Sequence, residues 1–325
     1  MINYLIRRIL YTIPILLGIN ILTFALFFMV NSPDDMARMQ LGQKHVQPEA
    51  ISQWKAQRGY DLPLFYNAKK TGTEQLTQTL FFQKSFLLFT FDFGTSDAGR
   101  DISYDISHRM WPSLAIAFPV LVLGMLVDIS FAMLMAFFRS SYLDLMGVLF
   151  CITLMSISTM FYIIGGQYLF GIVLRLVPIS GYDPGVDGIK FLVLPVLVAV
   201  FGGMGAGARW YRTLFLEEMG KDYVKTARAK GLSETRVLFR HVLKNAMLPI
   251  LTGLVVIIPS LFMGSLVLES FFGVPGLGSY TIDAIQQQDF AIVRAMVFLG
   301  SVLYIVGLIL TDISYTLVDP RVRLT

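Results

Sequence analysis

The sequence contains little charge for its length. Charged residues make up 15% of its 325 residues, whereas hydrophobic residues make up 55%. So apolar a chain has too few polar side chains to cover the surface of a water-soluble domain. The composition therefore predicts an integral membrane protein.

Several kinds of chemistry lack the residues that they need. A lone cysteine, Cys151, excludes a disulfide within the chain. None of the three histidines, His45, His108 and His241, stands at metal-ligand spacing from another. The sequence also has no Gly-x-x-x-x-Gly-Lys-Ser/Thr phosphate loop. We therefore expect a protein that is not an enzyme and that binds no metal or cofactor itself.

One glycine-rich run superficially resembles a nucleotide-binding motif. The run GGMGAGA at 202–208 fits a relaxed Gly-x-Gly-x-x-Gly/Ala pattern, but it lies within an apolar segment and follows no soluble strand. Small residues in a membrane helix let neighbouring helices approach closely. We interpret this run as a helix-packing surface.

What the sequence does have is a series of long apolar runs. Segments of about 20 apolar residues cross a bilayer as helices, and their continuous Leu, Ile, Val, Met and Phe content differs from the alternating pattern of a membrane barrel. The predicted fold is all-α with six transmembrane helices, at 9–29, 112–138, 144–174, 191–215, 249–272 and 291–317.

Basic residues give the predicted orientation, because short segments rich in Lys and Arg resist translocation. Arg7 and Arg8 place the N-terminus in the cytoplasm, and six spans then place the C-terminus and the basic loop 216–248 on the same side. The long loop 31–111 is external. The predicted regions are an anchor helix (1–30), an external subdomain (31–111), a transmembrane core containing the cytoplasmic loop (112–318) and a cytoplasmic tail (319–325).

The external loop contains an apolar stretch, FFQKSFLLFTFDFGTS at 81–96. This stretch is too short and too interrupted to cross the membrane. We expect it to lie along the outer surface or to pack on the spans.

The cytoplasmic loop has the pattern of two short helices separated by a break. Glu217, Lys221 and Lys225 stand four residues apart and favour a first helix through about residue 230. Gly231 is a natural helix stop and Ser233 a natural cap for the next helix.

The second helix of this loop is predicted to be amphipathic and to lead into the next span at Pro249. Its apolar and basic residues fall on different faces at 100° per residue. The apolar face contains Leu238, Val242 and Ala246, and the basic face contains Arg236, Arg240 and Lys244. A plain solvated connector that follows the positive-inside rule is the alternative interpretation.

The order of residues in this loop resembles the cytoplasmic signature of bacterial ABC importer permeases. That signature is Glu-Ala-Ala, three residues, Gly, and later Ile-x-Leu-Pro; the corresponding positions are 225–227, Gly231 and 247–249. Lys225 and Thr226 replace the leading Glu-Ala, and Leu-Pro falls further from the glycine than in the general pattern. The run YVKTARAKG at 223–231 resembles the dipeptide, oligopeptide and nickel branch of the family. The segments 1–24, 269–290 and 312–323 are also similar to that branch.

The resemblance implies a type I permease core in the bacterial cytoplasmic (inner) membrane. It also implies a second homologous permease, two ATPase subunits that hold ATP and Mg²⁺, a periplasmic solute-binding protein and a peptide substrate, with no role for nucleic acid. The loop would then contain the coupling helix that docks on an ATPase. The residues implied in this coupling are Tyr223, Thr226, Ala227, Gly231, Leu232 and Ser233, with Ala227, Gly231 and Leu232 at the centre of the docking turn.

Two other places carry candidate residues for the translocation pathway. Asp128 in the second span either lines the path or pairs within the bundle, since a carboxylate in a membrane is costly. The segment 272–278, which contains Phe272, Pro275, Gly276 and Gly278, either forms a gate or is a plain loop. For Asp312 we expect an ion pair with Arg209 or Arg212.

Several functions remain open at this point. A permease for nickel or another small solute belongs to the same family, although the predicted spans contain no histidine. A stand-alone secondary transporter or channel predicts inverted repeats, which we do not find. A purely structural scaffold would not need the break at Gly231.

Overall fold

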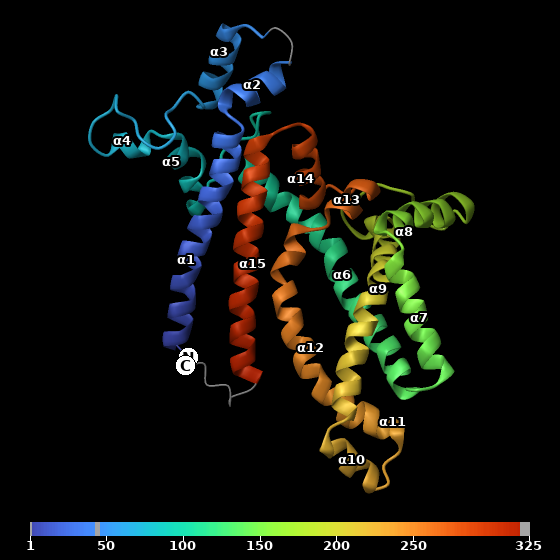
Figure 1. Ribbon diagram of the computed structural model, residues 1–325. Helices are drawn as coiled ribbons and strands as arrows, with labels where there is room; N and C mark the ends of the chain where they lie inside the picture. Colours follow the sequence, from blue (N-terminus) through green and yellow to red (C-terminus); the bar gives the residue numbers. More distant parts are fainter. Residues whose placement is uncertain (1, 43–45, 319–325) are drawn as a thin grey trace. The chain divides into compact units, whose positions relative to one another are not determined.

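The structure is a computed structural model that describes residues 2–42 and 46–318 (Figure 1). Within these ranges every regular element is a helix, and the one β-type contact is an isolated bridge between Thr95 and Asp101. The predicted all-α fold is confirmed. The predicted tail 319–325 lies outside the described residues.

The described part of the chain has five or six apolar helices that could span a membrane, compared with six predicted spans. Five helices of the described part are long and apolar enough to cross a membrane: Ile6–Val30, Ile102–Phe137, Val186–Met219, Glu234–Met263 and Phe290–Ser314. A sixth candidate consists of two helices, Tyr142–Ser156 and Thr159–Val173, that meet at 88°. The chain thus has five or six spans, depending on how this bent pair is counted.

Two predicted spans differ from the observed helices. The run 144–174 is not one straight helix, because Ile157 and Ser158 both adopt extended backbone angles and turn the chain. The run 249–272 is also wrong at both ends. The observed helix begins at residue 234 and ends at residue 263, where Gly264 has a positive φ of 68°.

The chain divides into two compact units, which are described separately. The first contains residues 2–109 and 280–309, and the second contains residues 110–279 and 310–318, within the described ranges.

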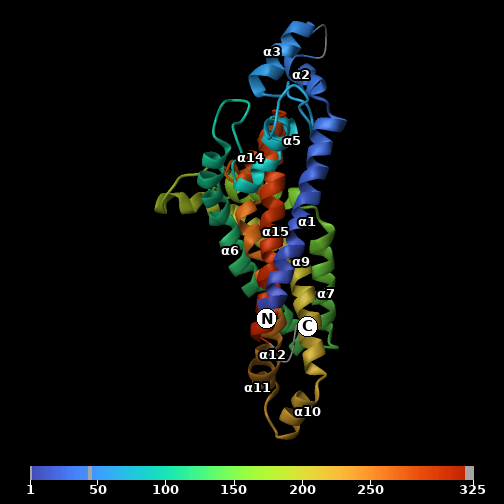
Figure 2. The same cartoon turned by 90° about the vertical axis from the view of Figure 1, so that its left-hand side faces the viewer.

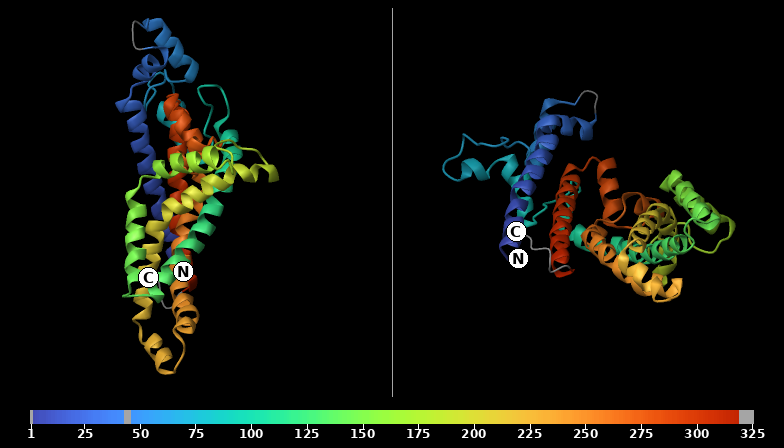
Figure 3. Two further views of the ribbon diagram at one scale, coloured as in Figure 1. Left: turned by 90° about the vertical axis from the view of Figure 1, so that its right-hand side faces the viewer. Right: turned by 60° about the horizontal axis from the view of Figure 1, so that its bottom comes forward.

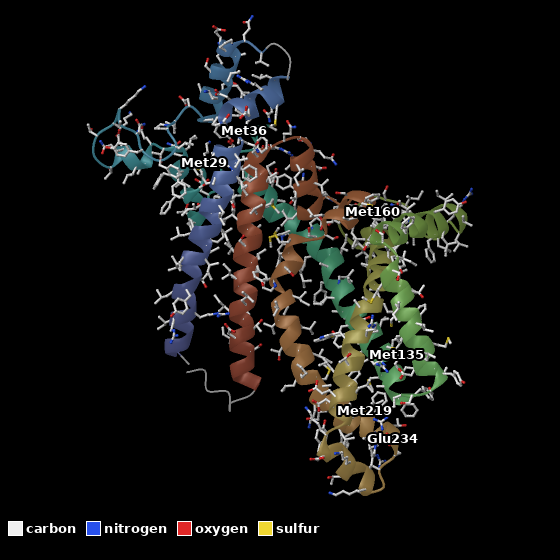
Figure 4. The ribbon with its side chains drawn as sticks, in the orientation of Figure 1. Met29, Met36, Met135, Met160, Met219 and Glu234 are labelled. Carbon is white, nitrogen blue, oxygen red and sulfur yellow. The ribbon has the colours of Figure 1, made fainter. Side chains whose placement is uncertain are left out.

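The first unit is built around an aromatic core. Its elements are α1 (Ile2–Ala25) with a π-helical end at Leu26–Val30, α2 (Pro33–Leu41), α3 (Pro48–Arg58), α4 (Glu74–Thr77), α5 (Leu80–Lys84) with a 3₁₀ turn at Phe86–Thr90, and most of α15 (Phe290–Val318). Phe24 from α1 and Phe28 from its π-helical end pack with Trp54, Tyr60 and Met36 in this core. Met36 is labelled on α2 in Figure 4.

The apolar stretch 81–96 packs on the long helices of this unit, as predicted. The ring of Phe89 lies 5.2 Å from that of Phe298 on α15. The Asn20 side chain on α1 donates a 3.0 Å hydrogen bond to the carbonyl of Ser85. The stretch is therefore held between two helices rather than crossing the membrane itself.

The second unit is a helical bundle with a broken helix at one end. It begins with the Met110–Phe137 part of α6 (Ile102–Phe137), α7 (Tyr142–Ser156) and α8 (Thr159–Gly166), which continues as a π-helix at Gln167–Val173. A 3₁₀ turn at Val186–Gly188 precedes α9 (Ile189–Met219), α10 (Asp222–Ala229) and α11 (Glu234–Val237), and α11 continues as a π-helix at Leu238–Leu243. The unit ends with α12 (Lys244–Ile257), a 3₁₀ turn at Pro259–Met263, α13 (Leu266–Phe272) and the first residues of α14 (Leu277–Gln286). Helix α8 turns away from α7 in Figure 3.

The glycine-rich run 202–208 brings two helices of the second unit together. It lies within α9, which packs along α7. A Cβ atom at Gly205 would lie 2.6 Å from the carbonyl oxygen of Cys151, closer than real Cβ atoms come. The run is thus a close-packing surface, as its position in an apolar segment predicted.

Candidate functional site

The main candidate site is the helix pair α10–α11, which extends beyond the lower end of α9 in Figures 1 and 2. Met219 at the end of α9 and Glu234 at the start of α11 are labelled in Figure 4. Helix α9 ends at Met219 with Gly220 as its C-cap residue, and extended backbone angles at Lys221 turn the chain into α10. The predicted Glu217–Lys221–Lys225 ladder is wrong, because this break places its members in different elements.

Two other ion pairs take the place of that ladder. Glu218, 9% exposed at the end of α9, binds the Lys221 ammonium and accepts a 2.5 Å hydrogen bond from the Tyr223 hydroxyl. Burial and this contact with Glu218 raise the pKa of Tyr223 to about 12. Lys225 pairs with Asp222 at 2.8 Å. The start of α10 is thereby fixed to the end of α9.

Helix α10 ends in a Schellman motif centred on Gly231. The Gly231 N–H donates to the carbonyl of Arg228 at 2.9 Å, and the Leu232 N–H donates to the carbonyl of Ala227 at 3.4 Å. Gly231 has a φ of +76°, which a residue without a Cβ adopts at little cost. Ala227 and Leu232 pack in the same apolar cluster, which is the contact that accompanies this motif. The predicted helix stop is therefore confirmed.

This motif changes how the candidate coupling residues are understood. Ala227 is 5% exposed and Leu232 is partly buried, so both side chains pack inside the chain's own core. Thr226, Gly231 and Ser233 are exposed. The first two side chains thus shape the turn, while the other three positions lie on the surface that a partner could reach.

Helix α11 begins at the predicted cap and is held by a charge pair. Ser233 occupies the N-cap position with extended backbone angles, although its side chain makes no capping hydrogen bond. Arg228 on α10 donates two hydrogen bonds to Glu234, of 2.7 and 3.1 Å. This pair joins α10 to α11 across the Gly231 turn.

The amphipathic character of the helix that follows is also confirmed. Leu238 is 5% exposed, and Val242 and Ala246 are fully buried. Pro249, however, is an interior residue of α12 rather than part of its first turn, because one continuous helical run from residue 234 leads into the span. A π-helical stretch at Leu238–Leu243, which the sequence did not predict, precedes α12.

The cations of the site fall into two groups. Lys221, Lys225 and Arg228 each pair with a carboxylate. The second group is exposed and has no carboxylate partner in the part of the chain that the structure describes. Its members are Lys230, Arg236, Arg240 and Lys244.

A second candidate site surrounds a buried carboxylate that the sequence analysis missed. Glu269 on α13 is 1% exposed and accepts hydrogen bonds of 3.0 Å from the backbone N–H groups of Ser265 and Ser279. The Ser113 hydroxyl on α6 also binds Glu269, and its oxygen accepts a 2.8 Å bond from the Leu277 N–H. Burial raises the pKa of Glu269, against the opposing effect of these hydrogen bonds.

The predicted gate residues form a compact turn around Glu269. Phe272, Gly276 and Gly278 are buried, whereas Pro275 is exposed. A Cβ atom at Gly276 would overlap the Glu269 carboxylate, and one at Gly278 would lie 2.6 Å from the Ser265 carbonyl. An acidic residue just before a run rich in glycine is the sequence signal that could have identified Glu269.

Asp128 lies on α6 opposite Gly207 of α9. A Cβ atom at Gly207 would overlap the carboxylate of Asp128. The Oδ1 atom of Asp128 is buried and has no hydrogen-bond partner among the described residues. Glycine at position 207 therefore makes the room that this carboxylate occupies between two helices.

The ion pair predicted for Asp312 is wrong. Arg212 instead donates two hydrogen bonds of 2.8 Å to Asp144 at the start of α7. Arg209 contacts the sulfur of Met155 at 3.6 Å. Asp144 lies in the first turn of α7 and its carboxylate is paired with Arg212 on α9.

No group of three His, Cys, Asp or Glu side chains in the described ranges could hold a metal ion.

These features define a helical membrane protein with several spans, in which ion pairs hold the helix pair α10–α11 at one end of the bundle. Residues 129–324 match the family of binding-protein-dependent transport system inner membrane components, and residues 1–85 match the N-terminal region of such membrane components. The chain belongs to this family, which confirms the resemblance to ABC importer permeases.

Individual relatives extend over nearly the whole chain. The oligopeptide transport system permease protein AppB of Bacillus subtilis is 32% identical, over 98% of this chain and 99% of the relative. A putative peptide transport system permease protein of Brucella abortus is 32% identical, over 98% of both chains. The glutathione transport system permease protein GsiC of Salmonella typhimurium is 29% identical, over 99% of both chains.

Proposed function

We propose that this chain is one permease subunit of an ATP-driven importer for peptides. The relatives described above are named for transport of oligopeptides, peptides and glutathione, which is itself a small peptide. These names favour a peptide over nickel as the substrate class. Membership of a binding-protein-dependent family argues against a transporter that works alone.

The proposed assembly contains a second homologous permease, two ATPase subunits that bind ATP and Mg²⁺, and an external solute-binding protein. In this assembly the two permeases together enclose the pathway. In this proposal the α10–α11 pair lies on the ATPase side of the membrane and both chain termini lie in the cytoplasm, in keeping with the basic residues of the pair.

The single observation that carries the proposed coupling role is that ion pairs and apolar packing fix the turn at Gly231 to the helices around it. Ion pairs hold α10 to α9 through Glu218 and to α11 through Arg228, and the cluster around Ala227 holds the turn on the bundle. A movement imposed on α10 is therefore passed to α9 and α12 rather than absorbed locally. Packed bundles change between discrete arrangements, so a small displacement can reorient the spans.

The turn around Glu269 is proposed to close one end of the pathway, and Asp128 is proposed to lie along it. The turn supports such a role because it holds non-helical backbone on a rigid, internally hydrogen-bonded base. Asp128 supports such a role because one carboxylate oxygen keeps unused hydrogen-bonding capacity.

Purification and uptake together test this proposal. The tagged chain, expressed with its neighbouring genes, should co-purify with two ATPase chains and a second permease. Membranes that contain the complex should take up a labelled peptide only with ATP and the binding protein. Uptake by the chain alone would overturn the proposal. If Ni²⁺ but not unlabelled peptide reduced the uptake of the labelled peptide, the proposal that peptides are the substrate class would be overturned.

A further inference from the structure

The basic residues of the run from residue 234 to residue 263 follow one side of the helix. Arg236, Arg240 and Lys244 recur every four residues, opposite the buried face of Leu238 and Val242. All three are exposed and have no carboxylate partner within the described ranges, whereas the nearby Arg228 is paired. Three neighbouring cations without intramolecular compensation form a surface that attracts an anionic partner.

Exposed apolar side chains continue this side of the helix beyond Lys244. Leu248 is 48% exposed and Leu251 is 50% exposed, and they follow Lys244 by one and two turns. At 1.5 Å per residue, Leu248 lies about 6 Å along the axis from Lys244. The side therefore changes from cationic to apolar within one helical turn, which is the pattern of a helix that leaves the headgroup layer and enters hydrocarbon.

A second segment of the same unit independently indicates that the start of α12 lies at the membrane–water interface. The turn between α6 and α7 lies at about the same height as the lower part of α12 in Figures 1 and 2. Arg139 in this turn is exposed, and Tyr142, the first residue of α7, is 84% exposed. Tyrosine with a nearby cation is typical of the membrane–water interface. The start of α12 and this turn therefore lie in one interfacial layer.

We propose that Arg240 and Lys244 bind the phosphate groups of anionic lipids in the leaflet next to α10. Both side chains are long enough to extend along the helix while their charged ends stay among the headgroups. Arg236 is a further turn away from the apolar surface and lies closer to α10.

An anionic lipid fits these two residues better than an acidic protein surface does. The α10–α11 pair extends beyond this layer, so a docked soluble subunit meets α10 and α11 first (Figure 1). Arg240 and Lys244 lie between that pair and the exposed apolar residues of α12. Each cation near an anionic membrane surface contributes about 1 kcal/mol of binding free energy.

The test compares lipid retention by matched variants of the full complex. The complex is reconstituted into vesicles of phosphatidylcholine and phosphatidylglycerol, extracted gently and weighed by native mass spectrometry. The double variant Arg240→Gln/Lys244→Gln should retain phosphatidylglycerol about 30-fold more weakly than the unchanged complex, since two contributions of about 1 kcal/mol are lost. The control Lys225→Gln/Lys230→Gln removes the same charge from the α10 region and should leave retention unchanged.

Subunit composition separates lipid binding from subunit docking. The double variant should keep its ATPase subunits both in these vesicles and in vesicles of phosphatidylcholine alone. Unchanged phosphatidylglycerol retention by the double variant would overturn the proposal. So would loss of the ATPase subunits from the double variant in both kinds of vesicle, because that result assigns the two cations to a protein contact. Neither result bears on whether peptides are imported.

Discussion

Arg228 binds Glu234 through two hydrogen bonds, of 2.7 and 3.1 Å, across a turn in which Gly231 has a positive φ of 76°. The two residues belong to different helices, so their pairing fixes the angle at which α11 leaves α10. Backbone hydrogen bonds at Gly231 and Leu232 end α10, and the Arg228–Glu234 pair sets the direction of α11.

Reversing one charge of this pair should weaken coupling, and reversing both should restore it. Glu234→Arg places two cations against each other, whereas Arg228→Glu/Glu234→Arg keeps an attractive pair. Since side chains exposed by 26% and 55% form this pair, its loss should cost about 0.5 kcal/mol and leave insertion intact. The measurement is substrate-stimulated ATP hydrolysis by the reconstituted complex. Failure of the double variant to exceed the single variant would show that the pair does not set the angle.

Gly231→Asp should leave the protein in the membrane but uncouple uptake from ATP hydrolysis. The substitution puts a side chain at a left-handed φ, at a cost of about 1 kcal/mol, and adds a charge on the exposed side of the turn. Gly231→Asn is the matched control, because asparagine tolerates this conformation and is uncharged. Peptide uptake and ATP hydrolysis should be measured together. Normal uptake by the aspartate variant would remove Gly231 from the coupling element.

Tyr223→Phe should loosen the start of α10. It removes the hydrogen bond to Glu218, which accounts for about 1.5 kcal/mol of local stability. Protease sensitivity of the segment after Gly220 should increase. Tyr142→Phe, at an exposed tyrosine, is the control and should change nothing.

The effect of Tyr223→Phe should not depend on pH in the neutral and mildly alkaline range. Because the pKa of Tyr223 is raised to about 12 from the ordinary 10.0, the stabilisation from the protonated hydroxyl is present below 10 and is lost as the pH rises through 12. An effect that disappears near neutral pH would mean that another group is responsible.

Asp144→Ala should destabilise the second unit strongly, whereas an apolar replacement of both partners should be tolerated. Breaking the Asp144–Arg212 pair leaves a largely buried guanidinium without its carboxylate, at a cost of about 3 kcal/mol or more. Asp144→Leu/Arg212→Met removes both charges together. The melting temperature in detergent should fall clearly for the single variant and much less for the double one. Equal losses would show that the ion pair itself stabilises the bundle.

Gly276→Ala should destabilise the turn around Glu269, because its Cβ atom has no room beside the carboxylate. Inserting a methyl group into such packing costs about 1–3 kcal/mol. Gly203→Ala is the control, since no heavy atom lies within 4 Å of the added Cβ. Thermal unfolding of the two variants should differ in this direction. If both variants melt like the unchanged protein, the turn is not built on Glu269.

The features that the sequence predicted depend on neighbours along the chain. The helix stop at Gly231 and the buried face of Leu238 and Val242 follow from backbone sterics and helical periodicity, which act over a few residues. The apolar spans follow from composition for the same reason. The same signals predicted that the stretch 81–96 lies along the outer surface or packs on the spans, and did not decide between the two.

The features that the sequence did not predict depend on residues far apart in the chain, or on backbone conformations that no proline or glycine indicates. Glu269 is surrounded by groups from Ser113, Ser265 and Ser279, which are brought together only by folding. The 88° break at residues 157 and 158 contains neither proline nor glycine. Arg212 pairs with Asp144, 68 residues earlier in the chain, and nothing in the residue spacing marks this pair.

The π-helical stretch Leu238–Leu243 lies between the turn at Gly231 and the membrane span, and its widened turn contains one residue more than an α-helical turn. A change of its N–H groups from the i−5 to the i−4 carbonyl would move the widened turn along the helix. When the widened turn passes a residue, that residue rotates by about 100° around the axis relative to the rest. A displacement of the turn would then reach the span after α11 as a rotation about the helix axis as well as a translation.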